Sequence, residues 1–301
     1  MIELKNITKS FDDFVALDDI TLKIDNSSIT GLIGYNGAGK TTLLKTAAGI
    51  YRPDSGTALL DGANAFDNNN ERKHLFFVPD ELWIPQNATL KSLSKYYADF
   101  YESFDRECLK KLIKLFELDE NKRIRSFSKG MQRQAEIIIA LSARPMYMLL
   151  DESFDGLDPQ KRDIVKKLLL EYMAETGAAL LIASHNLPEL SDMCDRIALL
   201  NGKKLALNCD IGDVSENLRR VNIVFDREVS EDDFSDISHQ KIRIEGKAAS
   251  FLLAGDIEAQ TEKLRRMNPV QLDMKRLSLE EVFLSETDDY SQRIEDIFKK
   301  D

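Results

Sequence analysis

The 301-residue sequence contains few cysteines and few histidines, three of each. Cys108, Cys194 and Cys209 are widely spaced, so no pair has metal-ligand spacing and no disulfide framework is indicated. The three histidines form no cluster in the sequence either. We therefore expect reduced, structural thiols of the kind found in cytosolic proteins.

Long apolar segments and excess positive charge are also missing. The most apolar stretch runs from Ile137 to Ala143, far short of the ~20 residues that cross a bilayer. The first residues, Met1 to Phe11, lack the apolar core of a signal peptide. The net charge of −11 argues against an extended nucleic-acid footprint, so we expect no nucleic-acid partner. If the protein works on a membrane, another chain must supply the membrane-spanning part.

The apolar pattern that is present indicates an α/β core. Mostly apolar runs at residues 28–34, 146–150 and 179–184 predict strands of a parallel sheet that is covered on both faces. Asp158-Pro159 predicts the start of a helix between the second and third runs, because Asp is a good cap and Pro suits the first helical position.

Two further segments interrupt or follow this core. Apolar residues at helical spacing predict a helical insert at about residues 85–130. Near residue 208 the pattern changes to alternating strands and one charged helix. We therefore predict a first domain at 1–210 and a small α+β domain at 211–301, which ends in an acidic tail.

A phosphate-binding loop is predicted after the strand at residues 28–34. The segment from Gly34 to Thr41, GYNGAGKT, fits the pattern G-x-x-x-x-G-K-S/T between a strand and a helix. Its glycines let backbone amides point at phosphate oxygens, and the helix N-terminus adds positive potential. Lys40 would supply charge to the β- and γ-phosphates, and Thr41 a hydroxyl to Mg²⁺. The loop alone indicates only a nucleoside triphosphate.

Two carboxylates, Asp151 and Glu152, follow the apolar run at 146–150. A strand end beside the phosphate loop is where an open α/β sheet binds its ligands. Asp151 is therefore expected to hold Mg²⁺ through water, and Glu152 to polarise the attacking water. A solvated turn is the alternative for this pair taken alone.

The segment from Phe127 to Gln132, FSKGMQ, resembles the signature motif of the ATP-binding subunits of ABC transporters, usually written LSGGQ. The resemblance covers about residues 1–210. It implies a P-loop ABC ATPase core with a parallel sheet flanked by helices, an N-terminal antiparallel part and a helical insert. Ser128 is expected to cap a helix whose N-terminus can receive a γ-phosphate, and in the family Ser128 and Gly130 meet the ATP bound to the opposite subunit. Lys129 and Met131 depart from the usual glycine and glutamine.

Other positions match the same family. Gly156-Leu157-Asp158 resembles the D-loop, which crosses between subunits, and His185 resembles the switch histidine that links the γ-phosphate to Glu152. Ser153 replaces a usual proline, and we have no functional reading of that change. The resemblance places Phe11 against adenine, although a core phenylalanine is the alternative. The implied nucleotide-binding residues are Phe11, Asn36, Gly37, Ala38, Gly39, Lys40, Thr41, Thr42, Ser128 and Gly130.

Asp80 departs from the family, which usually has glutamine after the segment that resembles Phe77-Val78-Pro79. An aspartate can accept a Mg²⁺-bound water, so Asp80 joins Thr41 and Asp151 as the expected metal-binding residues. It also adds negative charge beside the phosphates and cannot donate a hydrogen bond. Gln86 is a second candidate for the role, with worse spacing.

The resemblance implies an ATPase, with ATP and Mg²⁺ as cofactors, that energises a membrane transporter through ATP-driven dimerisation. Its partners would be a second ATP-binding subunit, identical or related, and integral-membrane subunits, which would place it on the cytoplasmic face of the cell membrane. The segment from Leu279 to Phe283, LEEVF, resembles an element of exporter-type ATPases and favours export. The alternatives are a soluble ABC-type ATPase acting on nucleic acid or the ribosome, and a nucleotide-controlled interaction module with weak turnover.

The helical insert is where such an ATPase would meet its membrane subunit. It holds the only tryptophan, Trp83, together with Tyr96, Tyr97 and Phe100. For any single ring, packing within the insert is an equally good explanation.

Overall fold

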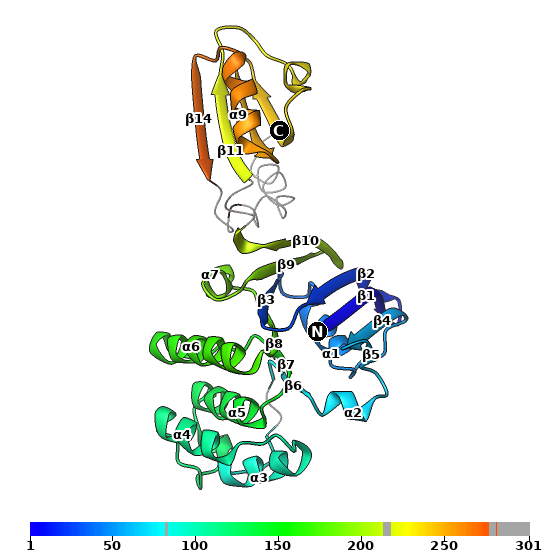
Figure 1. Cartoon of the computed structure of the whole chain (residues 1–301), viewed down its shortest axis with the longest axis vertical. Coiled ribbons are helices and arrows are strands. Elements are labelled where there is room, and N and C mark those ends of the chain that lie inside the picture. The colour runs from blue at the N-terminus through cyan, green and yellow to red at the C-terminus, as the bar shows by residue number, and fades with distance from the viewer. Residues whose placement is uncertain (82–83, 213–217, 277–280, 282–301) are drawn as a thin grey trace, which may run out of the picture. The chain divides into compact units, whose positions relative to one another are not determined.

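The protein is described here from a computed structural model that covers residues 1–81, 84–212, 218–276 and 281 (Figure 1). Trp83 and four residues of the exporter-like element (279, 280, 282 and 283) lie outside these described residues. The chain divides into two compact units, Met1–Asn208 and the residues from 209 onward. The first unit contains two sheets and the second contains one, and each unit has a hydrophobic core of its own.

A six-stranded sheet with the strand order β10-β9-β3-β8-β7-β6 forms the centre of the first unit. Neighbouring strands from β9 to β6 pair in parallel, so their carboxyl ends share one edge. Every residue of β7 and β8 is buried, as the apolar runs predicted. The strands are β3 (Ser28–Ile33), β6 (Leu75–Val78), β7 (Tyr147–Asp151), β8 (Ala179–Ser184), β9 (Arg196–Asn201) and β10 (Lys204–Asp210).

A four-stranded antiparallel sheet shares a hydrophobic core with this parallel sheet. Its order is β2-β1-β4-β5, with β1 at Ile2–Phe11, β2 at Phe14–Ile24, β4 at Ser55–Leu60 and β5 at Ala63–Asn64. Alternate residues of β1 and β2 share one hydrophobic core with the parallel sheet and with the helix α1 (Lys40–Ala47). The antiparallel part and the parallel sheet therefore both pack against α1.

The helices begin and end where local chemistry favours it. Helix α6 (Pro159–Thr176) begins after Asp158, whose Oδ1 accepts a hydrogen bond from the Lys161 amide at 2.9 Å, as predicted. It ends at Gly177, whose φ of 70° suits glycine. The other helices of this core are α2 (Asn69–Arg72), α5 (Lys129–Ala143) and α7 (Leu187–Ser191).

The predicted insert consists of α3 (Leu90–Phe100), α4 (Arg106–Phe116) and the short 3-10 helix η1 (Ile124–Ser126). Thr89 and Asp105 cap the two α-helices through their side chains. Both helices pack against α5, and Figure 1 shows α3, α4 and α5 gathered at one end of this unit. Within the described ranges, no helix is both long and apolar enough to cross a bilayer.

The second unit is a small α+β fold with the strand order β12-β13-β11-β14. Its neighbouring strands pair antiparallel, and α9 packs on one face through the buried Leu264. Asp256 caps α9, because its side chain accepts a hydrogen bond from the Ala259 amide. The elements are β11 (Leu218–Val224), η2 (Glu231–Phe234), β12 (His239–Glu245), β13 (Ala248–Ala254), α9 (Ile257–Arg266) and β14 (Gln271–Arg276).

Candidate active site

The glycine-rich loop joins the end of β3 to the start of α1. Gly37 and Gly39 have φ values of 83° and 102°, in the left-handed region that favours glycine. A Cβ atom at Gly39 would also lie 2.8 Å from the Ala16 carbonyl oxygen. Asn36 and Gly37 are exposed on this loop, whereas Ala38 and Gly39 are half-buried. The loop is therefore a backbone cradle that only this glycine spacing allows.

Lys40 is the most deeply placed charge of the loop, with a side chain that is 6% exposed. Its Nζ donates to the Gly34 carbonyl oxygen at 2.6 Å and lies 3.2 Å from Glu152 Oε1. The sequence-predicted lysine and carboxylate are thus brought together, although 112 positions separate residue 40 from residue 152. The next two residues, Thr41 and Thr42, follow in the first turn of α1.

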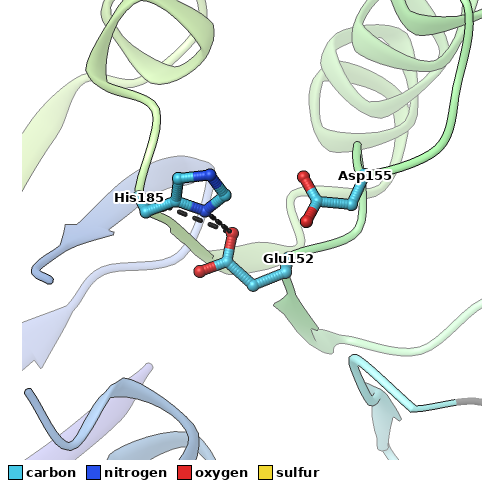
Figure 2. Close-up of side chains that lie close together, drawn as sticks. All are labelled: Glu152, Asp155 and His185. Atoms are coloured by element: carbon cyan, nitrogen blue, oxygen red, sulfur yellow. Dashed lines mark hydrogen bonds and ion pairs between the residues drawn. The ribbon is translucent and has the colours of Figure 1, made fainter. Parts of the chain in front are cut away.

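Glu152 and His185 form a second contact at the same edge of the sheet (Figure 2). His185 Nδ1 lies 2.9 Å from Glu152 Oε2, and the His185 amide donates to the same oxygen at 3.3 Å. Glu152 has a φ of 46°, and its amide donates to the Ala183 carbonyl oxygen of β8 at 3.0 Å. This strained backbone fixes the carboxylate between Lys40 and His185.

Asp151 is fully buried, and neither carboxylate oxygen has a hydrogen bond of normal geometry among the described residues. Burial raises the pKa of Asp151, the nearby Thr41 hydroxyl opposes this shift, and the charges of Glu152 and Asp80 raise the pKa further. An unsatisfied buried carboxylate beside a hydroxyl and a phosphate loop is a fitting donor set for Mg²⁺, which prefers oxygen ligands.

Asp155 is a residue of this site that the sequence reasoning missed. One oxygen of its carboxylate and single ligand atoms of Glu152 and His185 all lie within 4.8 Å of one another (Figure 2). The Asp155 amide also donates to the Glu152 carbonyl oxygen at 3.1 Å. The available signal was its position three residues after Glu152 in a glycine-containing turn.

Asp80 lies after β6 and contacts a residue that the sequence reasoning also missed, Arg133. Its Oδ1 is 3.6 Å from Arg133 Nη2, and its side chain is 54% exposed. Because its charge raises the pKa of Asp151, Asp80 lies within electrostatic range of the predicted metal site. Gln86, the second candidate for this role, is exposed at the start of the insert.

Ser128 and Gly130 are at the start of α5. Ser128 Oγ accepts a hydrogen bond from the Met131 amide at 3.2 Å, which confirms the predicted helix cap. A Cβ atom at Gly130 would lie 2.5 Å from the Gly156 carbonyl oxygen, so this position requires glycine. Among the described residues, Ser128 and Gly130 contact α5 and the turn at Gly156, and their hydrogen bonds and close contacts do not reach the cluster of Lys40, Glu152 and His185.

Phe11 ends β1 and is 40% exposed. Its ring meets Tyr51 edge to face, with centroids 5.3 Å apart, and Lys9 Nζ lies 5.4 Å from the ring centroid. It is therefore no core residue, but adenine stacking at Phe11 stays a prediction.

A glycine cradle with its lysine, a buried strand-end carboxylate and an adjacent glutamate define a P-loop nucleotide hydrolase. A family model described as ABC transporter matches residues 17–155. The ABC transporter ATP-binding protein YtrB of Bacillus subtilis is 31% identical to this chain, over 95% of this chain and 97% of YtrB. This chain therefore belongs to the family of ABC transporter ATP-binding proteins, and it binds and hydrolyses ATP.

Other relatives agree with this assignment. The lipopolysaccharide export system ATP-binding protein LptB of Haemophilus influenzae is 29% identical, over 68% of this chain and 88% of LptB. A solved ATP-binding subunit of an ABC transporter superposes with a TM-score of 0.67 at 25% identity, over 72% of this chain and 92% of that one. The fold is thus that of an ABC ATPase cassette.

Proposed function

We propose that this chain is the energy-coupling subunit of a membrane transporter, in which two such subunits close around ATP. The observation that carries the proposal is the cluster at the carboxyl edge of the parallel sheet. Lys40, Glu152 and His185 are joined by contacts of 3.2 and 2.9 Å, directly beside the buried and unsatisfied Asp151. No structural role explains the cost of burying that carboxylate, whereas nucleotide chemistry does.

Each side chain then has a task at the phosphates. Lys40 would leave Glu152 to neutralise the β- and γ-phosphates, which releases the Glu152 carboxylate to orient the attacking water. His185, already on Glu152, would hold that carboxylate in place and sense the γ-phosphate. Thr41 and Asp151 would hold Mg²⁺, which supplies charge neutralisation between the phosphates when it is bound.

The second half of the site would come from another subunit. Ser128 and Gly156 are exposed, and Gly130 brings their two segments into contact. They therefore form one continuous surface that a partner's ATP can meet at the N-terminus of α5. We infer that residues 1–210 are the nucleotide-binding domain and that 211–301 form an accessory domain. The partner is either a second copy of this chain or a related subunit, and activity of the purified chain that rises with concentration would indicate a second copy.

A hollow of about 690 Å³ in the first unit offers a place for the membrane subunit. Its lining includes the exposed rings of Tyr96 (55% exposed) and Phe100 (54% exposed), with Arg72 and Lys73 beside them. We infer that an amphipathic helix with acidic residues docks here, because aromatic and cationic groups line the same hollow. Docking of this kind would hold the chain at the cytoplasmic face of the cell membrane.

Export is the direction we infer, from the exporter-like segment at residues 279–283. Relatives from an export system and from an iron-import system match to similar extents, so the direction does not rest on them.

The proposal is tested by measuring Mg²⁺-dependent ATPase activity against protein concentration, with Glu152→Gln as the inactive variant. Specific activity should rise with concentration, and light scattering should show Glu152→Gln trapped as an ATP-bound dimer. ATP binding by a wild-type chain that stays monomeric and inactive would indicate a different ATPase partner or a required membrane subunit. A Glu152→Gln chain that hydrolyses ATP normally would contradict the proposed catalytic role, and slow, concentration-independent turnover in the wild type would favour a nucleotide-controlled interaction module.

A further inference from the structure

Arg133 is a buried cation to which the proposed function assigns no role. It lies in the second turn of α5, and its side chain is 5% exposed. Nη1 donates to the Pro79 carbonyl oxygen at 2.6 Å, and Nη2 donates to the Asp80 carbonyl oxygen at 2.7 Å. Nη1 also donates to Glu136 Oε2 at 3.0 Å. Because a guanidinium is a planar, rigid set of donors, these bonds fasten the loop after β6 to the helix that begins with Ser128.

The same guanidinium also faces the carboxylate of Asp80, the position at which the family usually has glutamine. Asp80 Oδ1 lies 3.6 Å from Arg133 Nη2. Asp80 follows β6, which pairs in parallel with β7, the strand that ends at Asp151, so an uncompensated Asp80 would act on the metal and phosphate positions. Aspartate alone would repel a bound triphosphate and would donate no hydrogen bond.

Glu136 neutralises the charge of Arg133 only in part. Burial raises the pKa of Glu136 to about 7, although the charge of Arg133 and its hydrogen bond lower it. Near neutral pH, Glu136 is therefore only partly ionised, and the Arg133 charge remains available to Asp80.

We propose that Arg133 is a positioning residue that neutralises Asp80 and holds the loop after β6 on α5, so that Asp80 and Arg133 act as one neutral unit at this edge of the site. The inference rests on the proposed function, because it assumes that ATP binds at Lys40 and Asp151. It explains how this chain can carry an acidic residue at position 80 and still bind a negatively charged triphosphate. It also ties the metal side of the site to the helix that meets the partner's ATP, since one side chain holds segments 53 positions apart.

A double-mutant cycle tests the charge balance. Arg133→Gln, Asp80→Asn and the double variant are compared in the Glu152→Gln background by isothermal titration with Mg²⁺-ATP, so that binding is measured without turnover. KM and kcat are then measured with Glu152 intact. Arg133→Gln should weaken Mg²⁺-ATP binding by about tenfold, through the exposed charge of Asp80, and raise KM more than it lowers kcat. Adding Asp80→Asn should restore binding to within about threefold of wild type.

The control is Arg144→Gln, at the other end of α5, where Arg144 pairs with Glu175 at 2.9 Å. It should leave Mg²⁺-ATP binding unchanged. Arg133→Lys keeps the charge with fewer donors and should bind better than Arg133→Gln.

If the double variant binds Mg²⁺-ATP no better than Arg133→Gln alone, Arg133 acts only through structure, and the inference is overturned. If Arg133→Gln does not fold, the single variant Asp80→Asn decides: binding weakened by more than about threefold would make Asp80 itself indispensable and contradict the neutral unit. These failures differ from a failure of the proposed function, which would show as normal turnover by Glu152→Gln with Arg133 and Asp80 unchanged.

Discussion

Replacing Asp151 with asparagine should separate the stability of the protein from its turnover. Asp151 is 0% exposed, and both of its oxygens lack a normal hydrogen bond among the described residues. An unpaired buried charge costs several kcal/mol, whereas an unpaired neutral polar group costs about 1–3 kcal/mol. Without Mg²⁺ or nucleotide, Asp151→Asn should therefore raise the free energy of unfolding at neutral pH by about 2 kcal/mol.

The pH dependence of this gain follows from the direction of the pKa shift. Burial raises the pKa of Asp151 above its ordinary value of 3.8, so the folded state holds this proton more tightly than the unfolded state does. The free energy of unfolding must then fall as pH rises from the ordinary value through the raised pKa. Asp151→Asn lacks this titration, so its advantage over wild type should be small near pH 3.8 and largest at neutral pH.

Thermal unfolding with and without Mg²⁺-ATP measures both effects. About 2 kcal/mol corresponds to a Tm increase of about 4–8 °C for a unit of this size. Mg²⁺-dependent hydrolysis should fall at least ~100-fold in the same variant. Asp99→Asn, at an exposed position of α3, is the matched control and should change stability by less than about 0.5 kcal/mol. A lower Tm for ligand-free Asp151→Asn, or full Mg²⁺-dependent turnover, would refute the reasoning.

Three further predictions concern other parts of the first unit. Gly130→Ala should destabilise the protein by about 1–3 kcal/mol and slow turnover, because the added methyl group would lie 2.5 Å from the Gly156 carbonyl oxygen. Chemical denaturation measures the first effect and ATPase assays the second. Unchanged turnover would contradict the packing argument. Burial raises the pKa of Glu136 from 4.5 to about 7, so the free energy of unfolding should fall as pH rises between these values. It should fall less in Glu136→Gln. Free energies from urea denaturation that change with pH by the same amount in both proteins would contradict this. Phe100→Glu, at a ring that is 54% exposed, should leave the ATPase activity of the isolated chain unchanged but lower the membrane-bound fraction of the protein in cells. An equal membrane-bound fraction for variant and wild type would argue against docking at the hollow that Tyr96 and Phe100 line.

The sequence predicted those parts of the site that depend on local chemistry. The glycine spacing from Gly34 to Gly39, the apolar runs of β7 and β8 and the caps at Ser128 and Asp158 all act within a few residues, and the structure has them as predicted. The meeting of Lys40 with Glu152 was predictable as well, because parallel strands end at the same edge of a sheet.

Contacts between distant segments were not predictable in this way. Arg133 reads as an ordinary helical residue, and nothing near it in the sequence indicates that it binds the backbone at Pro79 and Asp80. Asp155 reads as part of a turn, and nothing near it in the sequence indicates that its carboxylate lies beside Glu152 and His185. Such contacts depend on how the insert and the strands pack, which residue periodicity does not encode.

A mixing experiment tests most directly whether the catalytic site is built from two chains. Lys40→Ala removes the phosphate lysine and Ser128→Arg blocks the start of α5, so each variant alone should have no Mg²⁺-dependent ATPase activity. In an equal mixture, half of the randomly formed dimers pair the two variants, and each such dimer holds one intact site. The mixture should therefore recover about a quarter of wild-type activity. An inactive mixture of folded, ATP-competent chains, or a Ser128→Arg chain that is fully active alone, would contradict a site shared between two copies of this chain.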